Sequence, residues 1–140
     1  MKNIKWIILA LFIIGIGGAW YGYSEWNRVA KDLTSVKPDF ELTASELIKA
    51  FSDDEKKANS LYNGKVCAVK SKVISVDKDK LGLNTVMIGL DTDFNNVSCQ
   101  MDSTYNADAE KLVVGSEVTM KGICTGFLTD VILIKCVIQK

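Results

Sequence analysis

The hydrophobic residues of this chain follow three successive patterns. Residues 6–23 (WIILALFIIGIGGAWYGY) contain no charge, residues 43–62 carry hydrophobic residues at helical spacing, and the residues after Gly64 alternate between hydrophobic and polar. An uncharged run of about 17–25 residues is typical of a membrane-spanning helix, whereas strict alternation is typical of half-buried strands. The patterns therefore predict a transmembrane helix, then a helix, then a mainly β domain.

The charges that flank residues 6–23 predict the orientation of the transmembrane helix. Lys2 and Lys5 precede the run, whereas the acids and bases just after it cancel. Because positively charged flanks stay in the cytoplasm, we expect a single-pass signal-anchor with the N-terminus inside and residues 24–140 outside. Two alternatives stay open, a signal peptide cleaved near Gly17-Gly18-Ala19 and a buried core helix.

The segment between the apolar run and the β domain has two parts. Residues up to 41 are polar, irregular and contain the only proline, Pro38. We therefore predict an anchor and juxtamembrane stretch over 1–32, a tether over 33–41 and a folded domain over 42–140.

Two capping boxes, Thr43 to Glu46 and Ser52 to Glu55, predict the starts of two short helices or of one kinked helix. Gly64 suits the left-handed position that ends a helix. The helical region should therefore end before the first strand.

Five segments of the domain have the length and alternation of strands: 65–76, 85–90, 96–101, 116–124 and 131–138. A short helical turn over 107–112 separates the third from the fourth. Five short strands with this insertion match the five-stranded Greek-key barrel known as the OB-fold, with the N-terminal helix packed on it.

Four cysteines occupy the inward positions of these strands: Cys67, Cys99, Cys124 and Cys136. The chain has no histidine and no CxxC pair, so the spacing of metal ligands is missing. A catalytic cysteine also needs a neighbouring base and partial exposure. We therefore expect no metal, no cofactor and no enzymatic activity.

The cysteines leave two structural interpretations open. Buried thiols commonly act as small hydrophobic residues, and disulfides are plausible in a small exported domain. In an OB-fold the first strand is antiparallel to the fourth and the third is parallel to the fifth. This topology would pair Cys67 with Cys124 and Cys99 with Cys136, while other pairings stay open.

The charge of the domain bears on nucleic-acid binding. Residues 33–140 contain 15 acidic residues and 13 lysines, and no arginine follows Arg28. A single-stranded nucleic-acid site needs a basic groove with stacking aromatic side chains. The candidate lysines are Lys65, Lys70, Lys72, Lys78, Lys80 and Lys121. The net negative charge argues against this function, which we keep as the alternative.

Several pieces of the domain carry a family resemblance: ELIKAFSDDEKKAN, SLYNGKVCAVKSKVISV, VSCQM and VVGSEVTMKGICTGFLTDVILIKCVI. With these pieces, residues 42–138 resemble the tRNA-anticodon-like OB family of bacterial envelope proteins, which are secreted or lipid-anchored. The resemblance implies an OB-fold with a packed N-terminal helix. This chain has no cysteine near its N-terminus for a lipid, so the transmembrane helix would provide the anchor.

We therefore expect a membrane-anchored, extracytoplasmic binding module whose partner is a protein or a glycan of the envelope. OB-folds bind their ligands across the face of the second and third strands and the nearby loops. The residues that we predict for this face are Thr85, Met87, Phe94, Asn95, Ser98, Gln100, Tyr105 and Phe127.

Overall fold

The computed structural model describes residue 8 and residues 12–23, 32–90 and 95–140, which divide into two compact units at Asp32. In the first unit, residues 12–23 are helical. Among the described residues, no helix is both long enough and apolar enough to cross a membrane. Part of the predicted transmembrane run 6–23 lies outside the described residues, as do residues 24–31, so the anchor stays a prediction.

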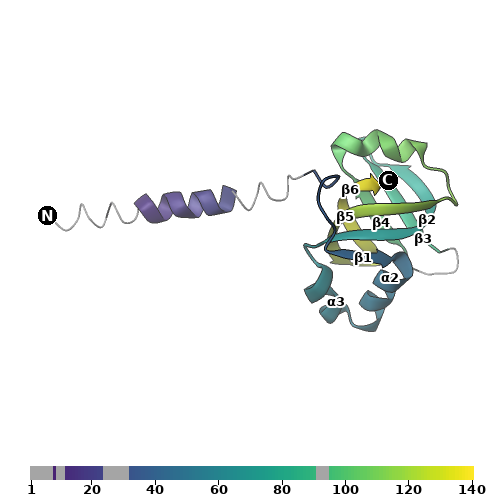
Figure 1. Ribbon diagram of the computed structural model, residues 1–140, viewed down its shortest axis with the longest axis horizontal. Coiled ribbons are helices and arrows are strands. Elements are labelled where there is room, and N and C mark those ends of the chain that lie inside the picture. Colours follow the sequence, from purple (N-terminus) through teal and green to yellow (C-terminus); the bar gives the residue numbers. More distant parts are fainter. Residues whose placement is uncertain (1–7, 9–11, 24–31, 91–94) are drawn as a thin grey trace. The chain divides into compact units, whose positions relative to one another are not determined.

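The second unit contains a closed barrel of five strands: β2 (Val66–Lys78), β3 (Asn84–Gly89), β4 (Val97–Met101), β5 (Glu117–Phe127) and β6 (Val131–Gln139). The order around the barrel is β2-β3-β4-β6-β5, and the pairing of β2 with β5 closes it (Figure 1). Only β4 and β6 run parallel among these pairs. This order confirms the predicted mainly β OB-fold.

Helical elements lie at both ends of the barrel (Figure 1). Helices α2 (Ala44–Asp53) and α3 (Glu55–Tyr62) lie at one end, and η1, a 3-10 helix over Ser103–Lys111, lies at the other. The side chains of α2 that face the barrel join its core, including Leu47 and Phe51. Helical elements therefore cover both openings of the barrel, and a ligand would bind to its outer surface.

The capping boxes explain where the helices begin. At α2 the Thr43 hydroxyl accepts from the Glu46 amide, and the Glu46 carboxylate accepts from the Thr43 amide at 2.8 Å, which confirms the first box. The second box is wrong, because Ser52 lies inside α2. Helix α3 instead begins after Asp54, whose carboxylate accepts from the Lys57 amide at 3.0 Å.

The predicted tether over 33–41 needs a correction, because this segment is part of the barrel unit. Strand β1 (Phe40–Thr43) pairs in parallel with β2, and the Asp39 carboxylate accepts from the Val66 amide at 3.0 Å. Leu33 is only 5% exposed. A polar sequence with a proline resembles a linker, but here its few apolar side chains and its backbone groups find partners on the barrel.

Candidate functional site

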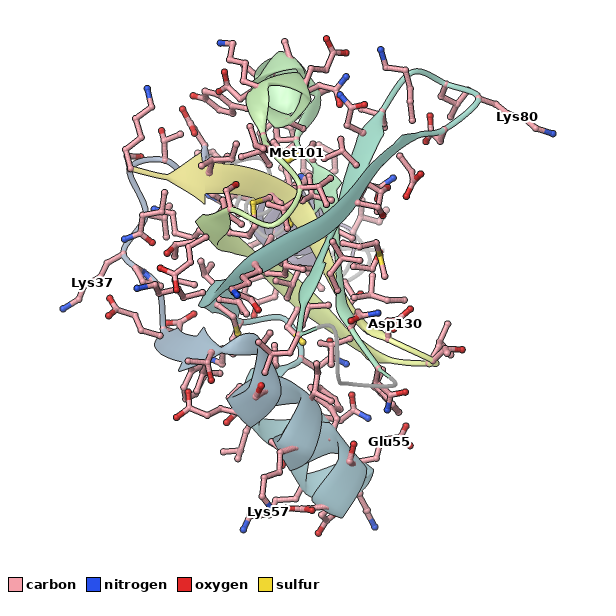
Figure 2. The ribbon with its side chains drawn as sticks, turned by 90° about the vertical axis from the view of Figure 1, so that its right-hand side faces the viewer. Lys37, Glu55, Lys57, Lys80, Met101 and Asp130 are labelled. Carbon is pink, nitrogen blue, oxygen red and sulfur yellow. The ribbon has the colours of Figure 1, made fainter. Side chains whose placement is uncertain are left out.

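One side of the barrel has outward side chains that are exposed or half-buried among the described residues of the second unit. On this side Asp77, Thr85 and Gln100 are paired across β2, β3 and β4, and the next row joins Ser75, Met87, Ser98 and Ile132. We call these residues, together with Ile134, the open face. Most are half-buried, and Asp77 is exposed. In Figure 2 the labelled Lys80 and Asp130 mark the two hairpins that border the open face.

The β2–β3 hairpin borders the open face at the η1 end. The Asp79 carboxylate accepts from the amides of Leu81 and Leu83, and Gly82 has a φ of 84°, which favours glycine. The buried Asn84 amide donates to the Asn106 side chain, and Asn106 donates to the Gly82 carbonyl at 2.8 Å. These bonds fix the hairpin against η1.

An ion pair adds to this attachment. Lys78 Nζ lies 2.8 Å from Glu110 Oε1, and the hydrogen bond with Lys78 lowers the pKa of Glu110. At the tip of the hairpin, Leu81 is 88% exposed. The hairpin thus presents a leucine from a rigid base.

The β5–β6 hairpin borders the open face at the other end. The Asp130 carboxylate accepts from the Asn96 amide at 2.8 Å, and the Val131 amide donates to the Asn96 carbonyl at 3.0 Å. The Asn96 side chain lies over Gly89, where a Cβ would meet its oxygen. Leu128 at the hairpin tip is 80% exposed. Each border of the open face therefore carries one exposed leucine.

The predicted site residues divide into three groups. Thr85, Met87, Ser98 and Gln100 lie together on the open face, since Thr85 pairs with Gln100 and Met87 with Ser98. Asn95 is half-buried just before β4, near the border that Asp130 forms, while Phe94 lies outside the described residues. The other two predicted residues, both aromatic, do not reach the face.

Tyr105 and Phe127, which the sequence analysis also predicts for the ligand face, do not lie on the open face. Tyr105 belongs to η1 and packs on the core from the end of the barrel. The Phe127 ring stacks on Phe51 at 5.8 Å and fills the space between α2 and the barrel. Both positions looked like loops in the sequence, where an aromatic side chain suggests a contact with a ligand.

The structure adds six residues that sequence reasoning missed: Ser75, Asp77, Leu81, Leu128, Ile132 and Ile134. The alternation of β6 contained a signal, because Ile132 and Ile134 stand opposite in parity to the buried Leu133. The closure of the barrel brings them beside β4, which the pattern of a single strand does not reveal.

The six candidate lysines do not form a basic groove. Lys70 lies 3.6 Å from Glu117, and Lys78 pairs with Glu110. Lys121 is 5% exposed, and its Nζ donates to the carbonyls of Thr34 and Val36 at 3.2 and 2.9 Å. The open face itself contains no lysine or aromatic side chain.

The four cysteines are fully buried in the core and are free thiols. Burial and the neighbouring Cys124 raise the pKa of the Cys67 thiol to about 12, and burial raises the pKa of Cys136 beside Cys99. The thiols thus stay protonated and are poor nucleophiles. Cys67 lies near Cys124 and Cys136 near Cys99, as in the predicted pairs, but the structure has no bridge between them, so the disulfides stay a prediction. Among the described residues, no cluster of three or more potential ligands could hold a metal ion.

The fold is also seen in a solved structure. A crystal structure of a candidate nucleic acid-binding lipoprotein from Klebsiella pneumoniae matches the chain with a TM-score of 0.62 and 21% identity. The match covers 71% of this chain and 91% of the Klebsiella chain. At this identity the likeness establishes the fold. No curated protein matches the chain.

The family assignment comes from a separate match. The family model tRNA_anti-like matches residues 1–138, which is almost the whole chain. The chain therefore belongs to the tRNA_anti-like family.

Proposed function

We propose that the barrel is a non-enzymatic binding module and that its open face takes the ligand. The observation that carries this proposal is the uncovered sheet of β2, β3, β4 and β6 between two rigid hairpins. Helices α2, α3 and η1 and residues 33–43 occupy other parts of the barrel surface. OB-folds in general bind ligands on this part of the barrel.

The chemistry of the open face favours an extended protein segment as the ligand. Met87, Ile132 and Ile134 offer half-buried apolar surface, and Ser98 and Gln100 place hydrogen-bonding groups beside them. The exposed leucines of the two hairpins extend the apolar surface at both borders. Interfaces between proteins combine an apolar centre with such polar groups.

The absence of activity is supported by the state of the nucleophiles. The thiols are buried, and the raised pKa values of Cys67, Cys124 and Cys136 keep them protonated at neutral pH. The aspartates of the β2–β3 hairpin have structural partners, since Asp79 accepts from two backbone amides and Asp77 accepts from the Ser75 hydroxyl. We therefore assign binding and no reaction to the domain.

We further propose that the apolar run 6–23 holds the barrel at the extracytoplasmic side of a bacterial inner membrane. The support is the uncharged length of this run and the lysines that precede it. The Klebsiella protein that shares the fold is described as a lipoprotein, which is a membrane-attached class of protein. An alkaline carbonate wash of membranes tests this proposal: the full chain should stay in the pellet, and release into the wash would contradict an integral anchor.

Single-stranded nucleic acid is the second candidate ligand, because the Klebsiella lipoprotein is described as a nucleic acid-binding candidate. Lys72 and Lys80 are exposed lysines near the borders of the open face. An anisotropy titration of the full chain in detergent with labelled single-stranded DNA and RNA decides this. Micromolar binding that weakens steeply with salt would favour nucleic acid over protein.

The main proposal has a matched test on two threonines. Thr85 lies on the open face, and Thr119 lies on β5 beside Lys70; both are half-buried strand residues that point outward. Peptides selected from a random library on the full chain should lose at least tenfold in affinity with Thr85→Glu and keep it with Thr119→Glu. Equal effects, or loss with Thr119→Glu alone, would contradict the assignment of the face.

A further inference from the structure

A pocket lies on the side of the barrel that residues 33–43, the N-terminal segment of the second unit, cross. Its volume is about 460 Å³, and its wall is formed by Thr34, Tyr105, Asp108, Lys121, Val137, Ile138, Gln139 and Lys140. The pocket thus lies between η1, the end of β6 and the segment before β1. None of these residues belongs to the open face, so the pocket is a separate feature.

The wall of this pocket contains a buried ammonium group. Lys121 points outward from β5, yet it is only 5% exposed because the N-terminal segment covers it. Its row across the sheet is apolar and buried, with Ala68 on β2 and Val137 on β6. Leu33 is buried as well and contributes to the same segment. The apolar surroundings therefore favour the aliphatic part of the Lys121 side chain and disfavour its charge.

Among the described residues, the hydrogen-bond partners of this ammonium are neutral. Lys121 Nζ has three donors, and two of them reach the carbonyls of Thr34 and Val36. Among the described residues, no carboxylate lies within ion-pair distance of it. Asp108, which also forms the wall, has its carboxylate 3.2 Å from Lys111. A buried charge without an opposite charge is costly, so the site favours an anion.

The other groups of the wall define which anion fits. Val137 and Ile138 provide an apolar surface, and Gln139 supplies an amide at the exposed end of β6. Lys121 supplies the one buried positive charge of the wall, since Lys140 is exposed, and the Asp108 carboxylate in the same wall opposes a second negative charge. A monoanion therefore suits the pocket better than a phosphate. We propose that this pocket binds a small organic carboxylate, with Lys121 Nζ as the charged donor and Ile138 against the apolar part of the ligand.

The experiment compares two probes that differ only in charge. N-acetylalanine and its neutral amide are titrated separately into the full ¹⁵N-labelled chain in detergent, and amide shifts are followed by NMR. The carboxylate should cause saturable shifts at residues 121 and 137–139, with an affinity at least fivefold above that of the amide. Equal shifts from both probes would overturn the proposal, and so would tighter binding of inorganic phosphate at the same residues.

Variants at two positions test whether Lys121 provides the charge that binds the carboxylate. The test therefore does not depend on Lys121→Met alone, which could unfold the domain. Lys121→Met should abolish the difference between the two probes. Gln139 is exposed, so Gln139→Glu and Gln139→Lys change the charge at the rim and leave the fold intact. The first should weaken carboxylate binding about fivefold and the second should strengthen it about fivefold, as expected for one charge at short range in water. Equal affinity in both Gln139 variants would overturn the proposal, whether or not Lys121→Met folds.

Discussion

The outward residues on two sides of the same barrel differ in burial. On β2, β5 and β6 the outward residues Ala68, Lys121 and Val137 are almost fully buried. On β3 and β4 the outward residues Met87 and Ser98 stay half-buried. Both sides come from strands with similar alternation. The difference arises because residues 33–43 cross one side and leave the other uncovered.

This contrast shows that a strand pattern alone does not tell which surface is available to a ligand. The alternation correctly separates inward from outward positions. It treats Lys121 and Lys72 alike, although the first is buried and the second exposed. The covering segment is far away in sequence, and its contacts decide the outcome.

The largest expected effect on stability comes from a substitution at Leu33, in the segment that covers one side of the barrel. Leu33→Asp should destabilise the domain by about 2–4 kcal/mol, because it removes a buried side chain and buries a charge in its place. Urea unfolding followed by far-UV circular dichroism measures this loss in the free energy of unfolding. The matched control Leu81→Asp, at a position 88% exposed, should leave the midpoint unchanged. Equal losses in the two variants would contradict the covered side.

The next effect concerns the hydrogen bonds of the same segment. Lys121→Met keeps most of the stem but removes the donors to Thr34 and Val36, so we expect a loss of about 1–3 kcal/mol. Lys72→Met on the neighbouring strand serves as the control and should change the free energy of unfolding by less than about 0.5 kcal/mol. A neutral Lys121→Met variant would show that the segment is held by other contacts.

A pH titration of stability tests whether the Cys67 thiol is buried in the core. The pKa of Cys67 rises from its ordinary value of 9.0 to about 12 in the fold. Above pH 9 the unfolded chain loses this proton while the folded chain keeps it. The free energy of unfolding should therefore fall as the pH rises from about 9 towards 12, by up to about 1.4 kcal/mol per pH unit for this thiol. Cys67→Ser should reduce this slope, and an unchanged slope would contradict the assignment.

The smallest effect on stability is expected on the open face. Thr85→Glu should change the free energy of unfolding by less than about 0.5 kcal/mol, because its side chain points outward and is only half-buried. A denaturant midpoint measured beside that of Thr119→Glu checks this. A large loss at Thr85 would mean that the open face is part of the packed structure and is poorly suited to a ligand.

Much of the fold is predictable from local patterns. Inward alternation locates Cys67, Cys99, Cys124 and Cys136 in the core, and the capping box locates the start of α2 at Thr43. These signals act over a few residues. Strand β1 carries no such signal, because its four residues form a strand only by pairing with β2.

The candidate site is less predictable than the fold. The four open-face residues of β3 and β4 follow from alternation, since Thr85 and Met87 have the same parity. Phe127 illustrates the limit, because its position near a hairpin suggests exposure while the helix α2 supplies Phe51 as its partner. Contacts between elements that are distant in sequence determine which residues line the face.

One measurement tests the role of the open face most directly. The native thiols are buried, so a single cysteine introduced by Met87→Cys or Thr119→Cys can be labelled alone with a bulky maleimide. Binding of the library-selected peptides is then compared by anisotropy before and after labelling. We predict that the label at position 87 abolishes binding and that the label at position 119 leaves it unchanged. Full binding with the label at position 87 would contradict the assignment of the open face as the ligand site.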